Sequence, residues 1–282
     1  MAETKVYTSY LQIGKLSIAL EFSDREYADS FRWYFQDDGS ITEADFTFFV
    51  DIVFHDVDFT IPSSLFRDKS LEENRIIFGD KAIILEMDWA NRRGRMQVEK
   101  YISHAPNTRV YEQLFYQFFY DLARLKKYDA CLVHSSGVIK NQKGYLFLGP
   151  SEAGKSTAAE LSREYTIVND EICLLEFQDD HIILRGTPFN GFYRDKNKGE
   201  APLKALFLLN KAPEHRIEPV SLGKASTTIM CEIVPPLGVG ELLEPAVHHS
   251  MLDLSFKIIQ KTRVFNLYFQ KNSGFWEQID KL

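Results

Sequence analysis

The chain has 282 residues, of which 45% are hydrophobic and 26% are charged, and this composition is typical of a folded globular protein. Its formal net charge of −7, without a run of Lys or Arg, gives no general attraction to nucleic acid or acidic membranes, so neither is expected as a partner. No apolar run approaches the length that crosses a bilayer, no signal peptide is evident, and three cysteines lie far apart: Cys131, Cys173 and Cys231. We therefore expect a cytoplasmic protein with buried, reduced thiols.

Residues 1–128 are predicted to form a strand-rich α+β module without recognisable chemistry of its own. Apolar residues alternate over residues 16–22, which indicates a half-buried strand. A helix is expected directly afterwards, because Ser23 and Glu26 have the spacing of a capping box. Its aromatic residues recur at helical spacing and should face the core: Tyr27, Phe31, Tyr34 and Phe35.

The next part of the module is predicted to contain mainly strands. Residues 46–59 are rich in aromatic and β-branched side chains and indicate one or two strands. Three polar residues within them could bind a metal, although a solvated strand face is the favoured interpretation: His55, Asp56 and Asp58. Residues 75–86 indicate a hairpin turning at Gly79-Asp80, and residues 89–101 indicate another turning near residues 91–94.

The strongest helical pattern in the chain lies between residues 108 and 127. Its apolar stripe consists of Tyr111, Leu114, Phe115, Phe118, Leu122 and Leu125. So many aromatic rings could stack on nucleic-acid bases, but basic neighbours are missing, and core packing is the favoured interpretation. This helix is expected to close the first module.

The segment 145–159 has residue types and spacing that together indicate phosphate binding. Residues 145–148 predict a buried strand, residues 149–154 a loop, and Lys155 the start of a helix carrying Ala158, Ala159 and Leu161. This context distinguishes a P-loop of the pattern G-x-x-x-x-G-K-[ST] from an ordinary glycine turn. The predicted nucleotide-binding residues are Gly149, Pro150, Ser151, Glu152, Ala153, Gly154, Lys155, Ser156 and Thr157.

The chemistry of this loop predicts ATP and Mg²⁺ as cofactors. Backbone N–H groups of residues 149–154 can form a concave nest for phosphate oxygens, assisted by the start of the following helix. Lys155 supplies an ammonium to the outer phosphates, and the hydroxyl of Ser156 supplies a ligand for Mg²⁺.

The second half of the chain predicts a mixed sheet rather than a doubly wound parallel one. Residues 131–140 and 145–148 are two apolar runs joined by Asn-Gln-Lys-Gly, which indicates a hairpin. The strand before the phosphate loop thus has an antiparallel neighbour. Residues 166–171 predict a short strand that ends in Asp170 and Glu171, unusually soon after Lys155.

Residues 129–282 resemble a known family. The carrying motifs are Val133-His134-Ser135-Ser136-Gly137, the phosphate loop, and Val168-Asn169-Asp170-Glu171. They look like the catalytic domain of HPr kinase/phosphorylase and its relatives, which have the phosphoenolpyruvate carboxykinase type of P-loop fold. Softer matches lie at residues 186–191, 201–209, 264–269 and 275–279. The resemblance implies an α/β fold with a mixed sheet.

The resemblance implies ATP-dependent phosphorylation of a hydroxyl, usually that of serine. By position, His134 matches the family's active-site histidine, Asp170 its catalytic acid/base, and Glu171 the second acid near Mg²⁺. Glu152 departs from the family, because a carboxylate stands where glycine is common and could weaken nucleotide binding. The sequence that marks true HPr kinases is missing, so HPr is not the expected acceptor.

Two functions remain open at this point. One is a kinase that uses Asp170 as base, with Lys155 and His134 in its catalytic site and a small molecule, peptide or protein as acceptor. The other is a regulator that binds ATP without turnover and interacts with a partner. Arg185 and Arg194 could hold phosphate or an acidic acceptor, or be surface charges. Self-association through the second domain is implied by the resemblance.

Overall fold

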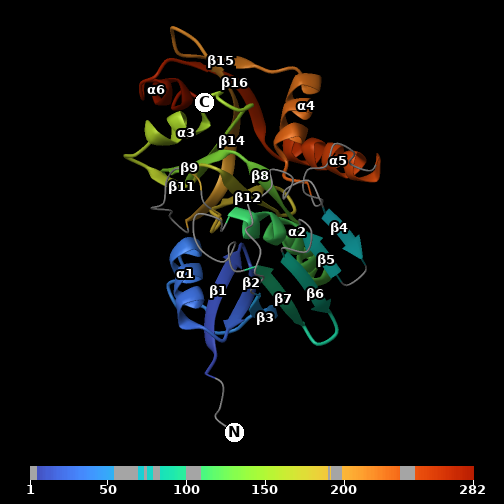
Figure 1. Ribbon diagram of the computed structural model, residues 1–282. Helices are drawn as coiled ribbons and strands as arrows, with labels where there is room; N and C mark the ends of the chain where they lie inside the picture. The colour runs from blue at the N-terminus through green and yellow to red at the C-terminus, as the bar shows by residue number, and fades with distance from the viewer. Residues whose placement is uncertain are drawn as a thin grey trace. The chain divides into compact units, whose positions relative to one another are not determined.

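The computed structural model describes residues 5–53, 69–72, 75–78, 83–99, 109–189, 191, 199–235 and 245–282. The chain forms two compact units, whose described residues fall within 5–119 and within 120–282 (Figure 1). Their division falls inside helix α2 (Arg109–Lys126). The domain boundary expected from the sequence, between residues 128 and 129, stays a prediction. Each unit contains helices and a mixed sheet, so the expected α/β class is confirmed at this level.

The first unit is built on a seven-stranded sheet in the order β1-β2-β3-β7-β6-β5-β4. The pairs β2–β3 and β3–β7 are parallel, and the other neighbours are antiparallel. The elements are β1 (Tyr7–Ile13), β2 (Leu16–Phe22), α1 (Arg25–Phe35), β3 (Phe46–Val53), β4 (Lys69–Glu72), β5 (Arg75–Phe78), β6 (Ile83–Asp88) and β7 (Arg93–Glu99).

The start of α1 corrects one prediction. The strand over residues 16–22 is confirmed as β2, and the aromatic residues of α1 are buried as expected. The N-cap, however, is Asp24 and not Ser23, because a carboxylate oxygen of Asp24 accepts a hydrogen bond from the backbone N–H of Glu26 at 2.8 Å. The capping box of Ser23 and Glu26 was therefore wrong.

The hairpin predictions are confirmed in one case and wrong in the other. Strands β5 and β6 pair antiparallel, with the expected turn outside the described residues. The second turn, at residues 89–92, overlaps the predicted one but joins β6 to β7, so the first strand of this hairpin precedes residue 89 and the predicted hairpin within residues 89–101 is wrong. Asp88 fixes its position by accepting hydrogen bonds from the backbone N–H and the side-chain amide of Asn91, which also hold the pKa of Asp88 below its usual value. His55, Asp56 and Asp58 lie outside the described residues.

Helix α2 packs its aromatic stripe into the core of the first unit. The Phe118 ring stacks on Trp89 at a centroid distance of 5.4 Å and meets Phe46 edge-on at 4.8 Å. Leu114, Phe115, Phe118 and Leu122 are all fully buried, which confirms core packing in place of base stacking. Leu125 is 48% exposed and does not belong to the stripe. The side chain of Tyr111 is outside the described part of the structure.

The second unit is built on a nine-stranded mixed sheet. Its main path is β11-β9-β10-β14-β13-β12-β8, and β16 joins β14 and β15. The strands are β8 (Ala130–His134), β9 (Ser136–Lys140), β10 (Lys143–Leu148), β11 (Thr166–Asn169), β12 (Ile172–Phe177), β13 (Ile182–Arg185), β14 (Glu200–Lys211), β15 (Arg216–Pro219) and β16 (Arg263–Phe269). The helices are α3 (Lys155–Glu160), α4 (Leu222–Glu232), α5 (Pro245–Lys261) and α6 (Phe275–Ile279).

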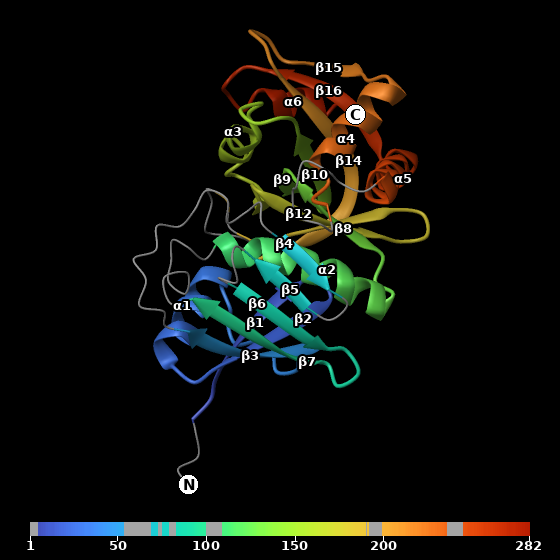
Figure 2. The same cartoon turned by 45° about the vertical axis from the view of Figure 1, so that its right-hand side comes forward.

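The long strand β14 organises this unit. It pairs parallel with β10 on one side and with β16 on the other, and its first residues pair antiparallel with β13. Alternate residues of β10 point to opposite faces: Leu146 and Leu148 pack with residues of α4 and α5, whereas Tyr145 and Phe147 pack with α3 and α6. The sheet is thus covered by helices on both faces (Figures 1 and 2).

The chain between residues 130 and 140 differs from the prediction. The antiparallel hairpin of β9 and β10 is confirmed. The expected single run, however, breaks at Ser135 into β8, which pairs with β12, and β9, which pairs with β10 and β11. Ser135 is fully buried at this corner, and its hydroxyl donates to Val133 O. Consequently His134 is not on the strand next to β10, and β9 lies between Asp170 and β10.

Other predicted features of the second unit are mostly confirmed. The expected elements near residues 201–209, 264–269 and 275–279 are β14, β16 and α6. Cys131 and Cys173 are buried, and burial raises the pKa of the Cys131 thiol to about 12. Cys231 is exposed, so the expectation that all the thiols are buried was wrong.

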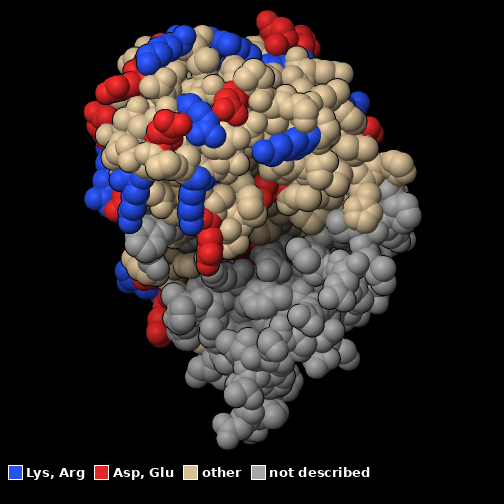
Figure 3. Space-filling view, turned by 90° about the horizontal axis from the view of Figure 1, so that it is seen from above, with Lys and Arg blue, Asp and Glu red and all other residues tan. Residues whose placement is uncertain are grey.

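The described helices show no membrane-spanning segment, and the face of the second unit in Figure 3 shows no concentrated charge. Among the helices that the structure describes, none is both long enough and apolar enough to cross a membrane. On the face of the second unit drawn in Figure 3, basic and acidic side chains are interspersed and do not gather into one field of a single sign.

Candidate nucleotide site

The phosphate loop follows β10 and requires glycine at two positions. The φ angles of Gly149 and Gly154 are 155° and 109°. A Cβ atom at Gly149 would lie 2.7 Å from the Cβ of Ala153, and one at Gly154 would lie 2.9 Å from the ring of Phe269. Glu152 also has a positive φ, 65°, in the left-handed region where glycine is common. The backbone thus has the alternation of unusual dihedrals from which anion nests are made.

The loop retains N–H groups that could bind phosphate. Its internal turn is closed by a hydrogen bond from Ala153 N–H to Pro150 O at 3.1 Å. Across the described residues, the N–H groups of Glu152 and Gly154 take no part in a backbone hydrogen bond. Helix α3 ends at Glu160, with Leu161 as its C-cap, and is therefore shorter than predicted. The loop amides and Lys155, rather than a long helix dipole, must supply most of the attraction for an anion.

Lys155 is held against the loop that precedes it. The side chain is 8% exposed, and its ammonium donates to Gly149 O at 2.5 Å and Pro150 O at 3.4 Å. The same nitrogen lies 3.6 Å from Oε2 of Glu232, a carboxylate that is equally buried. A phosphate that binds Lys155 therefore competes with two carbonyl groups and one carboxylate for the same ammonium.

Glu232 connects Lys155 to His134 and was missed by the sequence analysis. Its Oε2 atom lies 3.2 Å from Nδ1 of His134, and Nε2 of His134 lies 3.8 Å from Oε1 of Glu171. Four predicted or newly found polar residues thus form a continuous chain from Lys155 through Glu232 and His134 to Glu171. The residues around Glu232 contain no motif that could have indicated this role.

The sheet explains how Glu232 reaches this place. Glu232 is the last residue of α4, and the next residue, Ile233, forms a β-bridge with Val133. Val234 N–H then donates to Leu132 O at 2.9 Å, so the end of α4 continues along the edge of β8. Because β8 ends at His134, Glu232 is brought beside the histidine from far along the chain.

Asn169 fixes the turn that presents the two predicted acids. Its side-chain oxygen accepts from the N–H groups of Glu171 at 2.7 Å and Ile172 at 3.0 Å. Its amide donates to Thr187 O at 3.1 Å and Phe189 O at 3.0 Å. Asn169 is fully buried and joins the turn to the loop after β13. The sequence placed Asn169 in a motif but did not indicate this organising role.

Asp170 and Glu171 have different surroundings. Asp170 is 1% exposed, and a Cβ atom added at Gly191 would lie 2.7 Å from its carboxyl carbon, so the backbone of residue 191 covers this carboxylate. Glu171 points to His134, with side chains 34% and 39% exposed, respectively. Ser135 N–H donates to Glu171 O at 3.0 Å and holds the two strand corners together. Asp170 is not a member of the chain of contacts that runs from Lys155 through Glu232 and His134 to Glu171.

The donors predicted for Mg²⁺ fit a hard cation chemically. The residue after Lys155, Ser156, is exposed in the first turn of α3 and offers a hydroxyl, and Glu171 offers a carboxylate. In the part of the chain that is described, no three His, Cys, Asp or Glu side chains form a metal-binding group. Mg²⁺ in nucleotide sites is usually bound through one or two side chains together with phosphates and waters, so two donors are a usual number for such a site. Their role stays a prediction.

The arginines considered as anion ligands are only partly described. Nε of Arg185 donates to Glu176 Oε2 at 2.8 Å, and the guanidinium also pairs with Glu200. These contacts join β12, β13 and β14, so Arg185 has a structural role and is not the free surface charge that was considered. Arg194 lies outside the described residues.

Comparisons with known proteins add little to this geometry. No protein-family model matches the chain, and no curated protein matches it. Among solved structures, the HPr(Ser) kinase/phosphatase from Coxiella burnetii is similar at 12% identity and a TM-score of 0.29. The match covers 53% of this chain and 94% of that chain. The likeness concerns the fold alone and is too slight to carry an argument about activity.

Glu152→Gly is expected to leave nucleotide affinity unchanged within about twofold, because the Glu152 side chain is exposed and is well screened by water. The same substitution should stabilise the fold by up to about 1 kcal/mol, since glycine adopts a positive φ without steric cost. Calorimetric titration with Mg²⁺-ATP and thermal unfolding measure the two effects. Binding that tightens more than tenfold would show that the carboxylate faces the phosphates.

Glu232→Gln is expected to tighten Mg²⁺-ATP binding by about fivefold. The substitution keeps the shape of the side chain and removes a charge that attracts Lys155 and repels phosphate, an effect on the order of 1 kcal/mol. Glu277→Gln, on the exposed face of α6, is the matched control with the same change in net charge. If Glu232→Gln weakens binding instead, the carboxylate positions Lys155 for the phosphates and does not compete with them.

Proposed function

We propose that this protein is a Mg²⁺-dependent kinase that transfers the γ-phosphoryl group of ATP to a hydroxyl, of serine type, on a small molecule, peptide or protein. The observation that carries the proposal is the chain of contacts from the phosphate loop through Lys155 and Glu232 to His134 and Glu171. A loop that only binds nucleotide needs the glycines and the lysine, whereas phosphoryl transfer also needs polar groups beside them.

The binding step is assigned to the loop and its lysine. The N–H groups of residues 149–154 and the ammonium of Lys155 bind the phosphates, after Lys155 leaves the carbonyl groups of Gly149 and Pro150. Ser156 and Glu171 would hold Mg²⁺, which supplies charge neutralisation at the phosphates. These residues orient the γ-phosphoryl group towards an acceptor, and positioning of this kind provides most of the catalysis in phosphoryl transfer.

The base is assigned to Asp170, whose carboxylate takes the proton of the acceptor hydroxyl as the new O–P bond forms and the bond to ADP breaks. Because Asp170 is 1% exposed and lies under Gly191, it reaches an acceptor only if the backbone at residue 191 moves. His134 and Glu171 are open to solvent and are the next candidates for this role.

The burial of Asp170 favours a second candidate function. A regulator that binds ATP without turnover would have no need for an accessible base, and the ion pair of Lys155 and Glu232 could change when nucleotide binds. The two functions are separated by incubating the protein with γ-labelled ATP and Mg²⁺ in fractionated cell extract. The kinase predicts label on one acceptor in an ester typical of phosphoserine. Nucleotide binding without release or transfer of label supports the regulator, and no binding contradicts both.

A further inference from the structure

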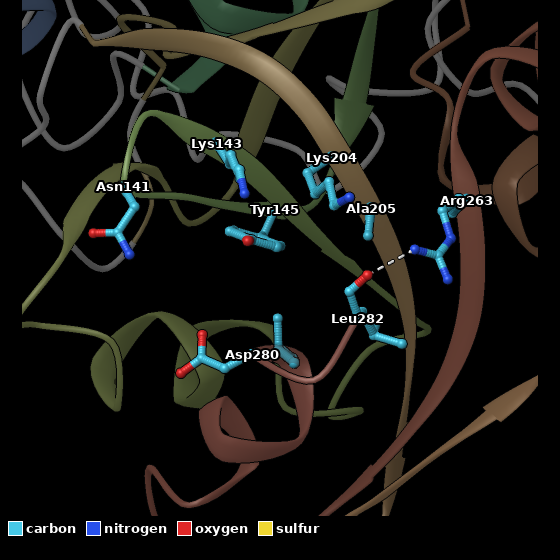
Figure 4. A pocket seen from close by; sticks show the side chains of 9 residues that line it. Asn141, Lys143, Tyr145, Lys204, Ala205, Arg263, Asp280 and Leu282 are labelled. Carbon is cyan, nitrogen blue, oxygen red and sulfur yellow. Dashed lines mark hydrogen bonds between the residues drawn. The ribbon is translucent and has the colours of Figure 1, made fainter.

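A cavity of about 270 Å³ lies in the second unit (Figure 4). Strands β10, β14 and β16, the β9–β10 turn and α6 contribute to it. Its lining includes Lys143, Tyr145, Lys204, Arg263, Asp280 and Leu282. Three of these side chains are cationic.

The sheet brings these cations together on three adjacent parallel strands, at the first residues of β10 and β16 and at the fifth residue of β14. Ala205 of β14 pairs with Tyr145 of β10 on one side and with Arg263, the first residue of β16, on the other. Lys143 is the first residue of β10 and shares a face with Tyr145, whereas the phosphate loop follows the last residue, Leu148. Five residue steps of about 3.3 Å separate the two ends of β10 by roughly 16 Å. A ligand in the cavity would therefore not touch the nucleotide.

The cavity has an excess of positive charge. Within the described residues, Lys143 and Lys204 have no ion-pair partner, and both side chains come from neighbouring strands beside the Tyr145 ring in Figure 4. The guanidinium of Arg263 donates a hydrogen bond from Nη1 to the main-chain oxygen of Leu282 at 3.0 Å. The acid in the lining, Asp280, is already bound through both oxygens by Lys140, at 2.7 and 2.8 Å.

Tyr145 adds a neutral hydrogen-bond donor to this site. The residue is 8% exposed, and burial raises the pKa of the phenol; the charge of Asp280 raises this pKa further, and that of Lys140 lowers it. The phenol is therefore protonated at neutral pH and can donate its O–H. The cavity thus combines an aromatic ring, one neutral hydrogen-bond donor and three cationic side chains. Such groups together can recognise a compact anion.

We propose that this cavity binds a small organic anion with two or more negative charges, a polycarboxylate or a phosphate ester, independently of nucleotide. Lys143 and Lys204 supply the charge, the Tyr145 hydroxyl donates a hydrogen bond, and Arg263 contacts the anion from the third strand. The volume suits a metabolite of this kind and is too small for a folded partner.

The test is calorimetric titration of the full chain with citrate, and separately with glycerol 3-phosphate, in buffer without Mg²⁺. We expect saturable binding of at least one anion by the wild type and at least about tenfold weaker binding by Lys143→Gln/Lys204→Gln. The control Lys127→Gln/Lys271→Gln removes two exposed lysines elsewhere and should bind as the wild type does. The preferred anion identifies the carboxylate or the phosphate class.

Two further variants keep the test specific. Lys155→Ala should retain anion binding, because the phosphate loop lies at the other end of β10. Tyr145→Phe removes one hydroxyl and should weaken binding about threefold without unfolding the protein, as thermal melting can verify. The proposal is overturned if the wild type binds neither anion, if the double lysine variant binds like the wild type, or if Lys155→Ala alone abolishes binding.

Discussion

Asp170→Asn is expected to slow phosphoryl transfer by roughly a hundredfold or more while the affinity for Mg²⁺-ATP stays near normal. Asparagine keeps the shape of the buried side chain and removes its ability to accept the acceptor's proton. A base that acts on the acceptor hydroxyl contributes little to holding the nucleotide. Transfer is measured with γ-labelled ATP and the acceptor, or as background ATP hydrolysis if no acceptor is known, and affinity is measured by calorimetry.

Asp179→Asn, in the exposed turn between β12 and β13, is the matched control and should retain full activity. Loss of nucleotide binding in Asp170→Asn would identify Asp170 as a metal ligand and move the base to Glu171 or His134. Full retention of a measurable activity would contradict the proposed kinase mechanism, in which the Asp170 carboxylate takes the proton of the acceptor hydroxyl.

Lys155→Ala is expected to weaken Mg²⁺-ATP binding by about a hundredfold, equivalent to about 2.7 kcal/mol. The substitution removes the ammonium that neutralises phosphate in a partly buried loop. It also leaves the buried Glu232 without the ammonium of Lys155, which should lower the melting temperature by a few degrees. Calorimetric titration and thermal unfolding of the same samples separate the two effects.

The double variant Lys155→Ala/Glu232→Gln provides the sharper control. Neutralising Glu232 should restore most of the lost thermal stability, since the buried charge is no longer uncompensated. Nucleotide binding should remain weak, because the ammonium is still missing. Recovery of binding in the double variant would mean that Lys155 only balances Glu232 and does not contact phosphate.

Features that depend on a few neighbouring residues could be predicted from the sequence. The hairpin of β9 and β10, the loop that starts at Gly149 and the helix at Lys155 follow from local spacing and from the conformations that glycine allows. The predicted N-cap of α1 was wrong by one residue, because Ser23 and Asp24 are both residue types that cap helices well. In the structure, the Asp24 side chain accepts the hydrogen bond from the N–H of Glu26.

The site beyond the loop depends on pairing between segments far apart in the chain, which a local sequence pattern does not encode. Residues 131–140 were interpreted as one run in spite of the polar residues 134–136, so the break at Ser135 was missed and His134 was put on the wrong strand. Glu232 reaches Lys155 and His134 only because the end of α4 pairs with β8, a contact between residues about a hundred positions apart. Asn169 was likewise recognised as part of a motif, but the sequence did not predict its hydrogen bonds to the loop after β13.

The most direct test of the phosphate-loop assignment compares the binding of Mg²⁺-ATP, ADP and AMP to the wild-type protein by calorimetric titration. If residues 149–157 bind the outer phosphates, affinity should fall from ATP to ADP and become undetectable for AMP, since AMP lacks the groups that Lys155 and the loop amides contact. Equal affinity for ATP and AMP, or no binding of ATP at all, would contradict the assignment.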